Sequence, residues 1–126
     1  MSLPIDSKEI DSPSNTNFVV QEFSKRCVGN AVLMTKVMGA FLKTFRADYE
    51  QLRTLHSALD FDSLRKMAHR MRGASGNVAA PRLHHLTAEI ESAAASGNIG
   101  QVAACLLQLT DAWSDFETEM LSWTPG

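Results

Sequence analysis

Residues 66–77, with the sequence KMAHRMRGASGN, place one histidine among cations and glycines. If this stretch is helical, the neighbours of His69 at one and two turns are three cations and two glycines: Arg65, Lys66, Arg72, Gly73 and Gly76. A neutral imidazole can act as a nucleophile near neutral pH, and cations beside it can bind the oxygens of a phosphoryl group. The stretch therefore predicts His69 as a phosphoryl acceptor, with Arg72 and Gly73 supporting the phosphoryl group.

The two glycines weaken the helix that contains them, because each costs about 1 kcal/mol relative to alanine. Without side chains they would leave the ring of His69 uncovered, so that a large partner can approach it. We therefore expect Gly76, together with Arg65 and Lys66, to face that partner. Two simpler interpretations stay open at this point. The glycines could serve close helix packing or fraying near Pro81, and His69 could be only a solvated residue.

Apolar residues in the same stretch follow one helical face. At about 100° per residue, six positions gather within roughly 60° of one direction: Leu64, Met67, Ala68, Met71, Ser75 and Val78. On this wheel His69 lies about 140° from Leu64. The pattern predicts a helix with a buried apolar face and with His69 exposed on its outer side.

Helical spacing continues on both sides of the stretch, and no segment alternates as a β-strand does. We expect helices over about 17–27, 30–59 and 81–96, a third helix that begins at an Asp62 cap and ends before Pro81, and a fifth that contains 102–123. Because the connections are short, these helices predict an all-α fold: an up-down-up-down antiparallel four-helix bundle with a short additional N-terminal helix.

Composition narrows the class of protein. The chain has 126 residues, 44% of them hydrophobic, and a formal net charge of −2. It has no basic stripe for nucleic acid, no apolar run long enough for a membrane span and no secretory signal. We expect a cytoplasmic monomer without nucleic-acid or membrane partners. Residues 1–16, rich in Ser, Pro, Asp and Asn, indicate a flexible leader or the end of a linker, which leaves 17–124 as the domain.

Other chemistry finds little support in the sequence. Cys27 and Cys105 lack metal-ligand spacing and are expected to be buried or free thiols, although a bridge between them stays open. Adjacent His84 and His85 point about 100° apart on a helix, so we expect no metal site there, nor at His56. The sequence contains no glycine-rich segment for ATP, which argues against kinase activity.

The sequence AHRMRGASGNVAAPRL, which begins at Ala68, resembles the signature of histidine phosphotransfer (HPt) domains. That signature has an Ala-His pair followed by a variable residue, an aliphatic residue, a lysine and a glycine. The later IESAAASGN is similar to the end of the family's fourth helix, and the resemblance extends over roughly residues 18–122. Three positions depart from the family: Met71 replaces leucine, Arg72 replaces lysine, and Ala79 stands where a glycine is common.

The resemblance implies that His69 takes a phosphoryl group from the aspartate of a response-regulator receiver domain and passes it to another receiver in a two-component phosphorelay. It implies no cofactor on this chain, since the Mg²⁺ would belong to the receiver, and a hybrid sensor histidine kinase as a possible partner in cis or in trans. Kinases of such systems typically carry an acidic residue after the histidine, whereas Arg70 follows here. The alternative is a helical-bundle adaptor that binds a signalling partner without being phosphorylated.

Overall fold

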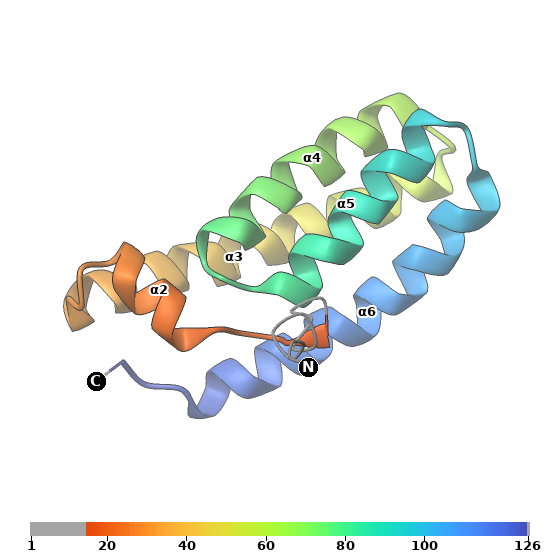
Figure 1. Cartoon of the computed structure of the whole chain (residues 1–126). Coiled ribbons are helices and arrows are strands. Elements are labelled where there is room, and N and C mark those ends of the chain that lie inside the picture. The colour runs from red at the N-terminus through yellow and green to blue at the C-terminus, as the bar shows by residue number, and fades with distance from the viewer. Residues whose placement is uncertain (1–14, 126) are drawn as a thin grey trace, which may run out of the picture.

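The fold is known from a computed structural model, which describes residues 15–125. These residues form five helices and no strand: α2 (Val20–Arg26), α3 (Ala31–Ser57), α4 (Phe61–Asn77), α5 (Pro81–Ala95) and α6 (Ile99–Ser122). Figure 1 shows α3 to α6 side by side, each running opposite to the one before, with α2 across one end. The expected all-α bundle with a short extra helix is confirmed. Within this part of the chain, no helix has the length and apolar character that a membrane span needs.

Side-chain caps define where three of the helices begin. At the start of α3 the side chain of Asn30 accepts a hydrogen bond from the N–H of Leu33, and at the start of α6 that of Asn98 accepts one from the N–H of Gln101. The cap of α4 is Asp60, which accepts from the N–H of Ser63 at 3.2 Å. The expectation that Asp62 is the cap was wrong, because the helix begins at Phe61 and places Asp62 inside its first turn.

The ends of four helices share one conformation. The second residue after the helix adopts a positive φ after α2, α3, α4 and α5, and these residues are Val28, Leu59, Ala79 and Gly97. A left-handed residue lets the following N–H groups satisfy the last carbonyls of a helix, as Ala80 N–H does for Ser75. Only one of the four positions holds the glycine that this conformation favours. Turn geometry therefore dominates side-chain preference at three helix ends.

The residues before α2 are tied to the turn between α4 and α5. Val19 N–H donates to the carbonyl of Ala79 at 2.9 Å, and Arg82 N–H donates to that of Thr16 at 2.9 Å. This extended attachment explains why the first helix begins at Val20 and is shorter than expected. Of the predicted leader, 1–16, all but the last two residues lie outside the described part, so its boundary stays a prediction.

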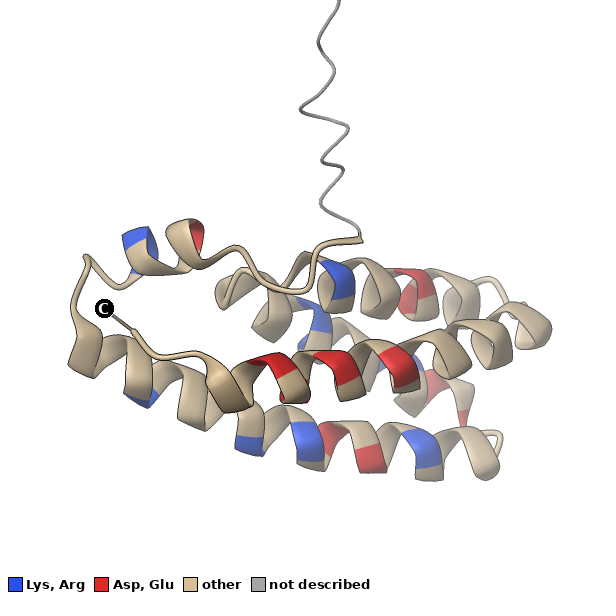
Figure 2. Ribbon diagram, turned by 90° about the horizontal axis from the view of Figure 1, so that it is seen from below, with Lys and Arg blue, Asp and Glu red and all other residues tan. Residues whose placement is uncertain are grey.

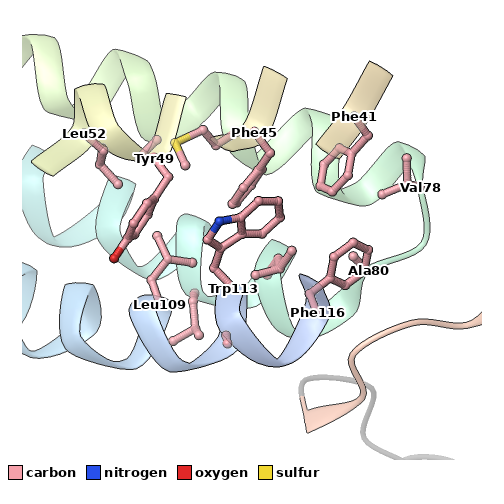
Figure 3. Close-up of a cluster of buried hydrophobic side chains, with 14 of the residues drawn as sticks. Phe41, Phe45, Tyr49, Leu52, Val78, Ala80, Leu109, Trp113 and Phe116 are labelled. Atoms are coloured by element: carbon pink, nitrogen blue, oxygen red, sulfur yellow. The ribbon is translucent and has the colours of Figure 1, made fainter. Parts of the chain in front are cut away.

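Aromatic side chains of α3 and α6 fill much of the core (Figure 3). Phe45 and Trp113 have ring centroids 4.6 Å apart, and Phe41 and Phe116 lie 5.6 Å apart. Along α3 the buried apolar residues recur at three- and four-residue steps from Met34 to Leu52, whereas Leu59 lies beyond the end of the helix and is exposed. Both cysteines are buried free thiols, and burial raises the pKa of the Cys105 thiol above its ordinary value.

Candidate functional site on helices α4 and α5

His69 projects outward from the middle of α4. Its side chain is 60% exposed, whereas its neighbour Ala68 is fully buried. The buried residues of the helix follow the predicted face and are Leu64, Ala68, Met71 and Ser75. Met67 departs from the expectation because it is only partly buried. The predicted exposure of His69 is thus confirmed.

The imidazole ring of His69 is held by a carboxylate from α5. Nδ1 of His69 lies 2.8 Å from Oε2 of Glu91, whose side chain is 21% exposed. An ionised carboxylate can only accept, so we assign the ring proton to Nδ1. The unprotonated Nε2 then carries the lone pair and, among residues 15–125, has no hydrogen-bond partner. The exposed ring therefore presents Nε2 as its nucleophilic atom.

Arg72 completes a cluster of three side chains with these two. Its Nε lies 3.2 Å from Oε1 of Glu91, so the carboxylate bridges His69 and Arg72. Nη2 of Arg72 is also 3.2 Å from Nδ1 of His69. Because a protonated Nδ1 cannot accept, we interpret this last distance as a contact and not as a hydrogen bond. The predicted neighbour of the histidine is therefore in place, held by Glu91.

Glu91 was not among the residues proposed from the sequence, although a signal for it exists. In an antiparallel pair of helices, residues equally far from the turn lie opposite one another. Taking Ala80 as the centre of the α4–α5 turn, Gly76 and His84 are four residues away, and they contact each other. His69 and Glu91 are each eleven residues from Ala80 and also contact each other. The hairpin register alone could have placed Glu91 opposite the histidine.

The other two cations predicted near His69, Arg65 and Lys66, form ion pairs with Asp62 and not with Glu91. Arg65 Nη2 lies 3.2 Å from Oδ1 of Asp62, and Lys66 Nζ lies 3.4 Å from Oδ2 of the same carboxylate. The hydrogen bond from Arg65, followed by that from Lys66, lowers the pKa of Asp62 below its ordinary value. Both cations thus remain on the exposed side of α4, one turn before His69. Their contact with a partner stays a prediction.

The two glycines do different things. A Cβ at Gly73 would meet nothing within 4 Å, so this position leaves open surface beside His69. A Cβ at Gly76 would lie 3.2 Å from Nδ1 of His84, and the Gly76 carbonyl accepts a hydrogen bond from Arg26 of α2. Close packing of helices is therefore sufficient to explain Gly76. That interpretation was open from the sequence, and the role of Gly76 toward a partner stays a prediction.

The side chain of Arg70, the residue after His69, extends toward α3 and not toward α5. Its Nη2 donates to Oδ1 of Asp48 on α3 at 2.7 Å, and its Nε donates to Oδ2 at 3.3 Å. Asp48 is a buried carboxylate, which requires such a partner. Arg70 therefore joins α4 to α3 and takes no part in the cluster around His69.

The remaining histidines do not assemble a metal site. Nδ1 of His84 lies 3.0 Å from the carbonyl of Arg72, and Nε2 of His85 lies 3.8 Å from Glu89. Across residues 15–125 no three His, Cys, Asp or Glu side chains are grouped so that they could hold a metal ion. In the view of Figure 2, the Lys and Arg positions are spread over several helices of the described chain.

Comparison with protein families identifies the class. The model of the Hpt domain family matches residues 36–119, which contain all of α4 and α5 and most of α3 and α6. The chain belongs to the Hpt domain family, as the motif around His69 indicated. It is accordingly a histidine phosphotransfer module of phosphorelays, a carrier rather than a kinase, whose partners are response-regulator receiver domains. Comparisons with curated proteins and with solved structures found no match.

Proposed function

We infer that Nε2 of His69 accepts a phosphoryl group from the aspartyl phosphate of one receiver domain and passes it to the aspartate of another. The observation that carries this proposal is the 2.8 Å contact between Nδ1 of His69 and Glu91 on an exposed ring. It holds the proton on one nitrogen and leaves the lone pair of the other facing solvent.

The uptake step needs little chemistry from this chain. The lone pair of Nε2 forms a bond to phosphorus, the bond from phosphorus to the aspartate oxygen breaks, and its electron pair returns to the receiver's carboxylate. The Mg²⁺ that neutralises the phosphoryl oxygens belongs to the receiver. This chain supplies the nucleophile, its orientation by Glu91 and positive charge from Arg72.

The surroundings of His69 suit a large partner. Gly73 leaves open space one turn after the histidine. One turn before it, Lys66 is exposed and Arg65 is partly exposed. We assign Arg72 and Gly73 to support of the phosphoryl group, and Arg65, Lys66 and Gly76 to the docking surface. We further propose that the module acts as a cytoplasmic monomer, and that a hybrid sensor histidine kinase supplies phosphoryl groups in cis or in trans.

Phosphorylation of wild type and His69→Ala tests the proposal. Each protein is incubated with a phosphorylated receiver or with phosphoramidate, then analysed by intact mass and by acid and alkali treatment. We expect one added phosphoryl group, labile in acid and stable in alkali, that His69→Ala lacks. His85→Ala is the matched control, because His85 is an exposed histidine on α5 outside the cluster. A folded wild-type protein that takes up nothing from any donor would favour the adaptor alternative.

A further inference from the structure

The proton on Nδ1 of His69 is faced by a small and defined set of charges. Glu91 of α5 contacts Nδ1 directly, and Arg72 of α4 contacts both. The other charged side chains nearby are bound elsewhere: Arg65 and Lys66 to Asp62 on α4, and Arg70 to Asp48 of α3. Among the described residues, Glu91 is therefore the anion and Arg72 the cation that contact Nδ1 of His69.

This proton matters most after phosphorylation, when Nε2 is bonded to phosphorus. In the outgoing step an oxygen of the acceptor, aspartate or water, forms its bond to phosphorus while the Nε2–P bond breaks. The electron pair of that bond returns to Nε2. If Nδ1 keeps its proton, the ring leaves as neutral imidazole, whereas without the proton it must leave as imidazolate. Imidazolate is the far poorer leaving group, so transfer depends on the proton at Nδ1.

We propose that Glu91 is a positioning residue that keeps Nδ1 of phosphorylated His69 protonated, and thereby makes the phosphorylated protein a fast and short-lived phosphoryl donor. The inference rests on phosphorylation of His69 as proposed above. The carboxylate accepts the Nδ1–H hydrogen bond both before and after uptake, and a charge-assisted bond of this kind favours the protonated ring. A neutral amide in its place would not.

Arg72 has the opposite effect on the same proton. Its guanidinium lies 3.2 Å from both Nδ1 and Oε1 of Glu91, so it offsets part of the carboxylate charge. Removing Arg72 leaves Glu91 free to stabilise the protonated ring more strongly. The two variants Glu91→Gln and Arg72→Gln should therefore change the lifetime of the phosphohistidine in opposite directions. A purely structural contribution of the pair would change both in the same direction.

The test measures loss of the phosphoryl group from protein phosphorylated with phosphoramidate, followed by intact mass between about pH 5 and 9. For Glu91→Gln we expect the lifetime near neutral pH to increase about three- to tenfold, with the fall in hydrolysis rate displaced to lower pH. Arg72→Gln should shorten the lifetime. Glu89→Gln is the matched control, because Glu89 lies on α5 but pairs with His85 and does not contact His69.

Each outcome bears on one of the two proposals. If His69 is phosphorylated but Glu91→Gln leaves both the lifetime and the pH profile unchanged, the role of Glu91 is refuted and the phosphotransfer function stands. Equal displacement in Glu89→Gln would likewise refute it, because the effect would not depend on contact with the ring. If His69 takes up no phosphoryl group in any folded variant, the proposed function fails and this inference with it. Circular dichroism of each variant confirms that the comparison is made between folded proteins.

Discussion

The α3–α6 side of the bundle and the α4–α5 side hold their helices together in different ways. Between α3 and α6, large aromatic rings pack against one another, as Phe45 and Trp113 do. Between α4 and α5, small residues let the backbones approach, and Gly76 lies directly against the ring of His84. The large aromatic rings of the core and the reactive histidine are thus placed on different helices.

The separation has a physical basis in the side chains of α4. None of its buried residues is aromatic, and the buried hydroxyl of Ser75 is satisfied by the Met71 carbonyl at 2.7 Å. The helix can therefore lie close to α5, which brings Glu91 within hydrogen-bonding distance of His69. A bulkier contact would move that carboxylate away. On this side, close packing serves the geometry of the site as much as stability.

Removing an aromatic ring on the α3–α6 side should have the largest effect on stability. Phe116 is fully buried against Phe18, Phe41 and Trp113, so Phe116→Ala should lower the free energy of unfolding by about 3–5 kcal/mol. Urea denaturation followed by circular dichroism measures the loss. Leu107→Ala, on the same helix but 73% exposed, should change it by less than about 0.5 kcal/mol. If Phe116→Ala lowered the free energy of unfolding by less than Leu107→Ala does, the aromatic rings would not be the stabilising contacts of the α3–α6 side.

The open surface at Gly73 provides the reverse test, in which stability rises while transfer falls. Gly73→Ala should stabilise α4 by up to about 1 kcal/mol, because its Cβ meets no atom. The same methyl group occupies the space beside His69, so transfer from a phosphorylated receiver should slow by about tenfold, equivalent to about 1.4 kcal/mol. Rapid-quench assays measure the rate of phosphoryl transfer from a phosphorylated receiver, which is a large donor, and from phosphoramidate, which is a small one.

Gly76→Ala is the matched variant for Gly73→Ala. Its Cβ would lie 3.2 Å from Nδ1 of His84, so the ring must shift and no gain in stability is expected. If Gly73→Ala slows the receiver and phosphoramidate reactions equally, the open surface is not used for docking. If it slows neither, the glycine has no part in transfer.

The left-handed turn between the two helices of the site predicts a smaller gain. Ala79 has φ +58°, a conformation that is unfavourable for a residue with a Cβ. Ala79→Gly should therefore raise the free energy of unfolding by up to about 1 kcal/mol, net of the greater entropy of the unfolded chain. Ala74→Gly, within α4, should lower it by about 1 kcal/mol. Thermal denaturation of both variants tests this prediction. If Ala79→Gly lowers the stability as Ala74→Gly does, the turn carries no strain.

The α4 helix illustrates how far sequence reasoning reaches. Its apolar period predicted the buried face and the outward direction of His69, because both follow from the geometry of one helix. The position of the cap was wrong by two residues, since Asp60 and Asp62 are equally good caps and only the preceding turn decides between them. Local pattern fixes the face of a helix better than its first residue.

Contacts between helices were harder to predict. The sequence placed Arg65, Lys66 and Arg72 all within one turn of His69. In the structure two of them bind Asp62, and only Arg72 reaches the histidine. Which anion each cation meets depends on side-chain reach across the surface, and a helical wheel does not encode it. Glu91 was missed for a related reason, since its relation to His69 exists only through the register of two helices.

The surface pairs on α4 should contribute least to stability, and pH titration makes this visible. Arg65 is the largest cause that lowers the pKa of Asp62 below 3.8, and Lys66 is the next. A carboxyl whose pKa is lowered on folding stabilises the protein above its unfolded pKa and loses that contribution as pH falls through the folded value. Because Asp62 is exposed, solvent screens the effect, and Asp62→Asn should leave the urea midpoint at neutral pH almost unchanged. Carbon-detected NMR titration should show the Asp62 midpoint rising toward 3.8 in Arg65→Gln and rising less in Lys66→Gln. An unchanged midpoint in Arg65→Gln would mean that this cation is free in solution and available to a partner without first leaving Asp62.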